Sequence, residues 1–229
     1  MCNDINYLYL KDHKVFAGLA KEQLYEVLKH AKFSRKRKSD IIRLSENEKP
    51  KLYFLIKGKV KIVETDRMSN SLIKAVEKEG SVFGNFVKND AVNNYEYAQS
   101  LSNETVYFYI NYQDFNTLCG AIPRLSLNLF ESISEKLKKS EVRYSHLAFK
   151  DVKTRLVYFF KFWASEEGKQ EGNSIVIQNY LTHSDIAEII STCRQTVTSI
   201  LNDLKSNGFI SYSRKEIVIS NIARLDTAA

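Results

Sequence analysis

The segment LTHSDIAEIISTCRQTVTSILNDLKSNGFI, residues 181–210, contains two amphipathic patterns separated by a few small polar residues. Thr182 and Asp185 stand three residues apart and precede an apolar pair, a capping-box spacing that predicts a helix over 183–190. Small polar residues at 191–192 favour a turn. Apolar residues then recur at the spacing i, i+3, i+4 and i+7, which predicts a second helix. These residues are Val197, Ile200, Leu201 and Leu204.

The second predicted helix has a polar face opposite to its apolar stripe. Gly208 is suited to end this helix, and the segment FISYSRKEIVIS that follows alternates like a two-stranded hairpin, with Arg214 and Lys215 near its tip. A helix, a tight turn, a second helix and a basic hairpin follow one another in this order in a winged helix-turn-helix. The residues of the polar face are Arg194, Gln195, Thr198, Ser199, Asn202 and Lys205.

The chemistry of this polar face favours the reading of DNA. An arginine can donate two hydrogen bonds to guanine, a glutamine can pair with adenine, and a helix N-terminus attracts phosphates. The net charge of +7 and the isoelectric point near 9.1 are consistent with a polyanionic partner. Such a face is also ordinary solvated surface in many isolated helices. Its coincidence with a short first helix, a tight connection and a basic hairpin favours DNA binding here.

The N-terminal half has a different pattern of apolar residues, which predicts mainly strands. Residues 15–31 predict a short helix, because apolar residues recur there at helical spacing, and residues 20–115 otherwise read as short strands with glycines between them. Gly58 is placed for a tight turn between two strands, and Gly80 and Gly84 punctuate the next pair. Short strands at near-regular spacing predict a small barrel or jelly roll.

A long helical pattern begins at Pro123 and continues to Ala148. Phe130, Leu137 and Tyr144 are seven residues apart, as are Ile133, Ser140 and Leu147. This spacing is that of a short heptad seam, by which two parallel helices pack on each other, and it predicts dimerisation. The alternative is an amphipathic helix that lies on its own β domain.

Composition excludes several classes of protein. The N-terminus has early charges and no apolar core of a signal peptide, and no stretch approaches the roughly 18 uninterrupted apolar residues of a membrane span, so we expect a soluble, cytoplasmic protein without a membrane partner. Cys2, Cys119 and Cys193 are odd in number and widely spaced, which fits reduced thiols and no metal site. We find no nucleophile with a base and no paired carboxylates, so we expect no enzyme.

The aromatic run around Trp163 has a simpler interpretation. Phe159, Phe160 and Phe162 surround this single tryptophan, and we interpret all four residues as core of the first element of the C-terminal domain.

Over nearly its whole length the chain resembles the Crp/Fnr family of bacterial transcription regulators. The resemblance lies in KLYFLIKGKVKIV, in SVFGNF, in HLAFKDVKTRLVYFF and, above all, in the segment quoted first. It implies an α+β fold with an N-terminal, jelly-roll-like β-roll sensor domain at 1–122, a dimerisation helix at 123–148 and a winged helix-turn-helix DNA-binding domain at 149–229. The dimerisation residues expected are Phe130, Ile133, Leu137, Tyr144 and Leu147.

The resemblance also implies a homodimer that binds a palindromic site in double-stranded promoter DNA, and RNA polymerase as a partner if the protein is an activator. Arg194 and Thr196 match the family pattern as a base contact and a phosphate contact. Gln195 stands where the family has glutamate and Ser199 where it often has arginine, so we expect a different half-site. The expected DNA-binding residues are Thr182, Arg194, Gln195, Thr196, Thr198, Ser199, Lys205 and Arg214.

The sensor end departs from the cyclic-nucleotide-binding relatives. Those have Gly-Glu after the turn and an arginine that pairs with the phosphate, whereas this chain has Gly84-Asn85 and, at the arginine position, Glu96. A carboxylate repels a cyclic phosphate, so we do not expect cyclic AMP to bind. An iron–sulfur cluster needs about four thiolates, and four scattered histidines suggest no haem ligand, so we expect no cofactor.

Other effectors stay open. The SVFG turn and the TCRQTVTSILNDL segment are also similar to the cyanobacterial nitrogen regulators of this family, which bind 2-oxoglutarate, and Arg143 is a candidate cation for such a ligand. A regulator without an effector and with a degenerate sensor domain, or a sensory module that does not bind DNA, are the alternatives. The candidate effector-pocket residues are Phe83, Gly84, Asn85, Phe86, Glu96, Tyr97, Ala98 and Arg143.

Overall fold

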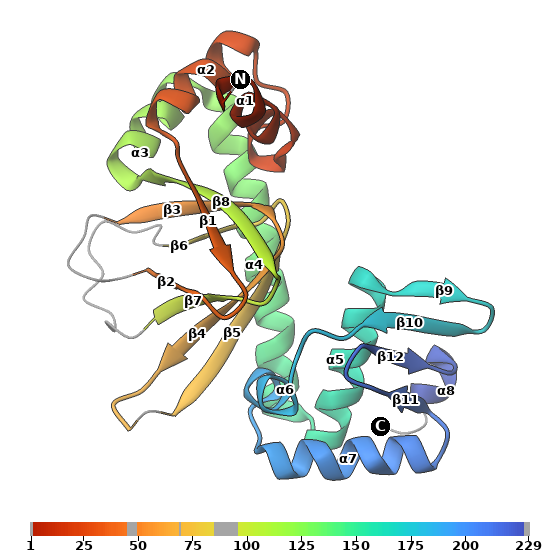
Figure 1. The fold of residues 1–229 in the computed structure, drawn as a ribbon. Helices are drawn as coiled ribbons and strands as arrows, with labels where there is room; N and C mark the ends of the chain where they lie inside the picture. Colours follow the sequence, from red (N-terminus) through yellow and green to blue (C-terminus); the bar gives the residue numbers. More distant parts are fainter. Residues whose placement is uncertain (1, 45–49, 69, 85–95, 227–229) are drawn as a thin grey trace. The chain divides into compact units, whose positions relative to one another are not determined.

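The structure is a computed structural model that describes residues 2–44, 50–68, 70–84 and 96–226 (Figure 1). The chain divides into two compact units, Met1–Lys139 and Ser140–Ala229, and each unit is described by itself. The division falls inside the longest helix, α4 (Pro123–Phe149), whose start and end agree with the predicted 123–148 to within one residue.

The N-terminal unit begins with three helical segments. These are α1 (Cys2–Asp12), the 3-10 turn η1 (Lys14–Phe16) and α2 (Lys21–His30). The single helix predicted over 15–31 is therefore wrong in its first third. Gly18 interrupts it with a φ of +75°, and the Gln23 side chain accepts from the backbone N–H of Ala20 where α2 begins. The sequence analysis did not predict helix α1.

Among the described residues of this unit, eight strands form two four-stranded antiparallel sheets with the orders β1-β8-β3-β6 and β2-β7-β4-β5. The jelly-roll-like prediction is confirmed, although the β region begins after α2 and ends at α3 (Tyr112–Ala121), so that 21–30 and 112–115 are helical. In Figure 1, α1, α2 and α3 gather at one end of the two sheets. The strands are β1 (Lys32–Arg37), β2 (Ile41–Arg43), β3 (Lys51–Lys57), β4 (Lys59–Thr65), β5 (Ser71–Lys78), β6 (Val82–Gly84), β7 (Glu96–Ser100) and β8 (Glu104–Asn111).

Gly58 marks the passage of the chain from one sheet to the other. Its φ is +88°, and a Cβ atom added there would lie 2.7 Å from the carbonyl oxygen of Glu104, so only glycine fits. The predicted turn at Gly58 is confirmed, but β3 and β4 on either side belong to different sheets and do not pair with each other.

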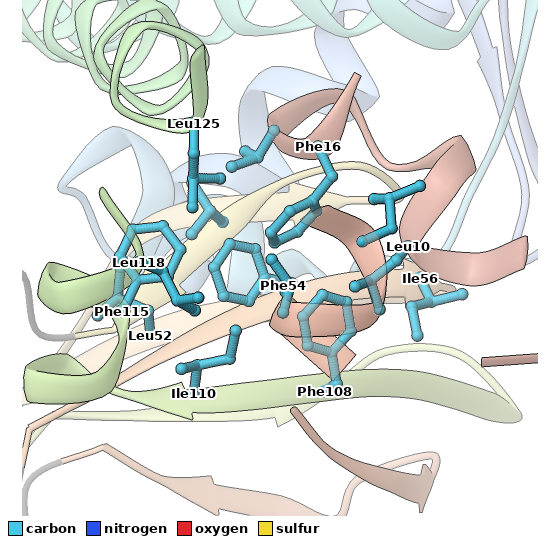
Figure 2. Packing of buried hydrophobic residues seen from close by; sticks show 14 of the residues in the cluster. Leu10, Phe16, Leu52, Phe54, Ile56, Phe108, Ile110, Phe115, Leu118 and Leu125 are labelled. Atoms are coloured by element: carbon cyan, nitrogen blue, oxygen red, sulfur yellow. The ribbon is translucent and has the colours of Figure 1, made fainter. Parts of the chain in front are cut away.

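An aromatic core joins the helices to the first sheet (Figure 2). The Phe54 and Phe108 rings stack with their centroids 4.8 Å apart, and Phe16 packs on both of them. Asn128 of α4 donates from its side-chain amide to the carbonyl oxygens of Val15 and Ala17. The start of α4 is therefore fixed to the N-terminal unit by packing and by buried hydrogen bonds.

The C-terminal unit combines helices with one four-stranded antiparallel sheet of the order β11-β12-β10-β9. The two helices and the hairpin predicted from the opening segment are confirmed. The pair β9 and β10 was missed, although Gly172 at its turn has a φ of +59°. The elements are α5 (Val152–Glu167), β9 (Lys169–Glu171), β10 (Ser174–Gln178), α6 (His183–Ile190), α7 (Arg194–Ser206), β11 (Ile210–Tyr212), β12 (Glu216–Ile219) and α8 (Ile222–Asp226).

The aromatic run of α5 contributes to the core of this unit. Phe160 and Trp163 are buried and Phe159 packs against both of them. Phe162, however, is 48% exposed, so its assignment to the core is wrong. It is two residues from Phe160, which places it about 200° around the helix from that buried position.

Candidate nucleic-acid interface

A capping box starts α6. The Thr182 hydroxyl accepts a hydrogen bond from the backbone N–H of Asp185 at 3.1 Å, and the Asp185 carboxylate accepts from the backbone N–H of Thr182 at 2.8 Å. Two of the unpaired backbone donors at the helix start are thus satisfied, as the sequence predicted. The Asp185 side chain is buried while Thr182 stays exposed. Thr182 therefore reaches solvent beside the N-terminus of α6.

The turn between the two helices is tight. Ser191 ends α6 in the left-handed conformation, with φ 56° and ψ 63°, and its backbone N–H donates to the carbonyl oxygen of Ala187. Thr192 donates to the same carbonyl oxygen at 2.9 Å. Helix α7 then begins at Arg194, two residues later. Ser191 allows this reversal because a short polar residue tolerates the left-handed region better than a branched apolar residue.

The predicted apolar stripe anchors α7. Val197, Leu201 and Leu204 are buried, and Ile200 is half-buried. The opposite face projects into solvent. Its exposed members are Arg194, Gln195, Ser199, Asn202 and Lys205.

Two threonines on α7 are half-buried rather than exposed. The Thr196 hydroxyl lies 3.1 Å from the sulfur of Cys193, and this hydrogen bond is the main reason that the pKa of the Cys193 thiol is lowered. The Thr198 hydroxyl donates to the carbonyl oxygen of Arg194 at 2.9 Å. Each hydroxyl is thus engaged within the protein and keeps at most part of its hydrogen-bonding capacity for a ligand.

The hairpin β11–β12 forms the wing, which we define as residues 210–219. Its turn is closed by Ser213, whose backbone N–H donates to the carbonyl oxygen of Glu216 and whose hydroxyl accepts from the N–H groups of Lys215 and Glu216. Arg214 and Lys215 at the tip are both exposed. Arg214 is the predicted DNA contact, and Lys215 is equally exposed.

The long helix presents an apolar stripe within the described chain. Phe130, Leu137 and Tyr144 are 69%, 59% and 75% exposed, Ile133 is at the border of exposure, and Leu147 is half-buried. Large apolar side chains in a row at a spacing of seven residues are rarely left in water on a monomer. The stripe is therefore suited to contact a second helix.

The candidate effector-pocket residues are spread over several elements. Phe83 on β6 and Ala98 on β7 are buried in one core cluster between the sheets, where Phe83 stacks on Tyr53 with ring centroids 5.3 Å apart. Gly84 ends β6 with a φ of +108°, and Tyr97 is half-buried on β7. Asn85 and Phe86 lie outside the described residues.

Two of the candidate effector-pocket residues are charged, Glu96 and Arg143. Lys74 lies 3.1 Å from a Glu64 carboxylate oxygen and 3.4 Å from a Glu96 carboxylate oxygen, so one ammonium group serves two acids. Arg143 belongs to the part of α4 in the C-terminal unit, and burial lowers the pKa of its guanidinium.

The described residues include neither a cluster that could hold a metal ion nor a helix that could span a membrane. Within residues 2–44, 50–68, 70–84 and 96–226, no three side chains of His, Cys, Asp or Glu are grouped so as to hold a metal ion. None of the helices described combines the length and apolar character needed to cross a bilayer.

Comparison with known proteins agrees with this geometry. The sequence profile of the Crp-like helix-turn-helix domain matches residues 154–228. The global nitrogen regulator of Synechocystis sp. is 28% identical over 173 residues, which make up 75% of this chain and 76% of that protein.

Solved structures share the fold of the chain. A mutant of CooA from Carboxydothermus hydrogenoformans superposes with a TM-score of 0.77 at 22% identity and covers 97% of this chain and 94% of its own. FixK2 from Bradyrhizobium japonicum gives a TM-score of 0.72 at 18% identity and covers 86% of this chain and 96% of its own. The predicted fold class is therefore confirmed.

Proposed function

We propose that the chain is a transcription regulator of the Crp/Fnr type, because residues 154–228 match the Crp-like helix-turn-helix domain, and that it binds a palindromic promoter site as a homodimer and reads the bases with α7. The family is made up of transcription regulators and not of enzymes, as expected from the lack of a catalytic constellation in the sequence. The single observation that supports base reading best is the exposed polar face of α7, which starts with Arg194 and is backed by the buried Val197 and Leu201.

The residues of α7 have distinct roles in this proposal. Arg194 donates bidentately to guanine in the major groove, and Gln195 both donates and accepts at a neighbouring base. Lys205 near the end of α7 and Arg214 on the wing neutralise phosphates, which carry no sequence information. Thr196 is a further phosphate contact, because it lies in the first turn of α7, where backbone N–H groups point outward. The backbone N–H and the hydroxyl of Thr182 both donate to Asp185, so Thr182 has no free donor for a phosphate.

A dimer is needed to read two half-sites. The exposed apolar stripe of α4, with Phe130, Leu137 and Tyr144, supplies the contact between two copies in this proposal. Two α7 helices then enter successive major grooves about 34 Å apart, so the half-sites are centred about one helical turn from each other. RNA polymerase as a partner of the bound dimer, and the cytoplasm as its place of action, complete the proposal.

We also propose that the β-roll does not take cyclic AMP. Glu96 stands where the cyclic-nucleotide-binding relatives have their phosphate-binding arginine, and its carboxylate repels a cyclic phosphate. Titration of the dimer with cyclic AMP should leave its DNA affinity unchanged. A rise in affinity at micromolar cyclic AMP would refute this part of the proposal, and 2-oxoglutarate is the next ligand to titrate, with Arg143→Gln as the matched variant.

The proposed function is tested by selection from a pool of random duplexes. The purified protein should enrich a palindrome, and the enriched duplex should bind at least about a thousandfold more tightly than random DNA at the same salt concentration. A duplex with only one half-site serves as the control and should bind far more weakly. If no sequence is enriched even in dilute salt, the chain is a sensory module without DNA recognition.

A further inference from the structure

The hydroxyl of Thr198 joins the first turn of α7 to the start of α6. It lies 2.9 Å from the carbonyl oxygen of Arg194, to which it donates, and 2.9 Å from Nδ1 of His183. A threonine hydroxyl has one proton. With that proton on the Arg194 carbonyl oxygen, the Thr198 hydroxyl is left to accept from His183, and we infer this arrangement.

This geometry assigns the tautomer of His183. The ring carries its proton on Nδ1, because only an Nδ1–H group can donate to a hydroxyl oxygen that is already acting as a donor elsewhere. Burial, and then the charge of Arg194, lower the pKa of His183 below 6.5. The ring is therefore mainly neutral at pH 7 and holds a single N–H, which the Thr198 hydroxyl accepts.

The other side of the imidazole faces the wing. The Tyr212 ring packs edge-on against His183 with centroids 5.1 Å apart and an interplanar angle of 63°. The Tyr212 hydroxyl accepts from the side-chain amide of Asn179 at 3.1 Å, and the same amide donates to the carbonyl oxygen of Ser213 at 2.9 Å. The backbone N–H of Asn179 donates to the carbonyl oxygen of Lys215 at 2.8 Å.

From these contacts we propose that His183 is a positioning residue. It orients the first turn of α7, and with it Arg194, through Thr198, and it couples α7 to the wing. The inference rests on the proposed function, because it concerns how accurately Arg194 meets a base. Arg194 is the first residue of α7, and its backbone N–H is one of the four at a helix start that have no acceptor within the helix. The link from His183 through Thr198 holds its carbonyl group in place. A bidentate contact tolerates little misalignment, so loosening this turn should cost discrimination at one base pair before it costs overall affinity.

Four substitutions test the link between His183 and Thr198: two remove a hydrogen-bonding group and two keep it. Thr198→Val removes the hydroxyl and keeps the branched shape, and His183→Phe removes the ring nitrogens and keeps an aromatic ring against Tyr212. Thr198→Ser and His183→Asn keep a hydroxyl and a donor at the Nδ1 position. Ser206→Ala is the matched control, because its hydroxyl also donates to a carbonyl of α7, that of Asp203, at the far end of the helix.

The readout is the ratio of dissociation constants between the selected duplex and its single-base-pair variants. Thr198→Val and His183→Phe should lower discrimination about fivefold, the scale of one hydrogen bond, at the base pair that Arg194 reads. Discrimination elsewhere should stay as in the wild type, the conservative variants should recover most of the loss, and Ser206→Ala should lose none. Full discrimination in Thr198→Val, or an equal loss at every base pair, would overturn the positioning role.

The tautomer is measured on the free protein. Nitrogen chemical shifts of His183 at pH 7.5 should show the proton on Nδ1; a proton on Nε2 would mean that the Thr198 hydroxyl donates to His183 and not to Arg194, which would overturn the positioning role. Failure of the proposed function is recognised separately, because the wild-type protein then selects no duplex at all, whatever the tautomer of His183.

Discussion

Arg155 donates a hydrogen bond from Nη2 to the carbonyl oxygen of Ser191 at 3.2 Å, and from Nη1 to the carbonyl oxygen of Lys150 at the same distance. Ser191 is the left-handed residue of the turn between α6 and α7, and Lys150 lies between α4 and α5. One guanidinium on α5 therefore fixes both the helix-turn-helix turn and the connector that follows the long helix.

Arg155→Lys should loosen this arrangement. Lysine keeps the charge but has one compact ammonium group, which cannot span two carbonyl oxygens as the planar guanidinium does. We expect the free energy of unfolding of the C-terminal unit to fall by about 1 kcal/mol, measured by urea denaturation. Trp163, the single tryptophan, lies in this unit and its emission reports on it alone. Arg67→Lys, at an exposed turn of the other unit, is the control; an unchanged midpoint in Arg155→Lys would contradict the bridge.

Leu137→Glu should convert the dimer to a monomer. The Leu137 side chain is 59% exposed on α4, in the middle of the apolar stripe, and a carboxylate placed there would be buried without a partner in a two-helix seam. Sedimentation should give half the wild-type mass, and binding of the two-half-site duplex should fall to the level of a single half-site. Lys138→Glu changes charge one residue away on the exposed side and should stay dimeric. A Leu137→Glu protein that sediments as a dimer would show that another surface joins the two copies.

His13 should make the N-terminal unit sensitive to acid. Burial is the main cause that lowers the pKa of His13 from 6.5 to about 4, and the neutral ring accepts from the backbone N–H of Val15 and donates to the carbonyl oxygen of Ser81. In the unfolded chain His13 binds a proton near pH 6.5, whereas in the folded unit it binds one only near pH 4. Stability is therefore full above pH 6.5 and falls as the pH drops toward 4, by roughly 3 kcal/mol in all.

The measurement is urea denaturation of the N-terminal unit between pH 4 and pH 8, followed by far-ultraviolet circular dichroism. His13→Asn keeps an acceptor for the backbone N–H of Val15 but does not titrate in this range, so its unfolding free energy should depend much less on pH. If His13→Asn keeps the wild-type slope, another group carries the acid sensitivity.

The C-terminal unit was predictable because local rules and tertiary packing agree there. The Thr182 cap, the polar turn and the apolar stripe of α7 each specify the same boundaries, and α6 and α7 begin where the sequence predicts. At Phe162 the aromatic composition suggested burial, but the helical period turns that position to solvent. In the N-terminal half, Gly18 breaks a pattern that apolar spacing alone had extended through residues 15–31.

Contacts between residues far apart in the sequence could not be predicted from local sequence patterns. Nothing in the sequence pairs His183 with Thr198, because they lie 15 positions apart on two helices whose crossing is a tertiary property. The same holds for Arg155 and Ser191. In the sensor region the loss of the family's phosphate-binding arginine can be seen in the sequence, because Glu96 stands at its position. The ion pair between Glu96 and Lys74 could not be predicted, since Lys74 lies on another strand of the sheet.

The central claim is that Arg194 reads a base. Its most direct test is the binding of wild type, Arg194→Ala and Lys205→Ala to the selected duplex and to all its single-base-pair variants, at several salt concentrations. Arg194→Ala should lose about 1–3 kcal/mol on the selected duplex and most of its discrimination at one symmetric base pair. Lys205→Ala should weaken every duplex alike and reduce the salt slope by about one. An equal loss on every duplex for Arg194→Ala would contradict the claim.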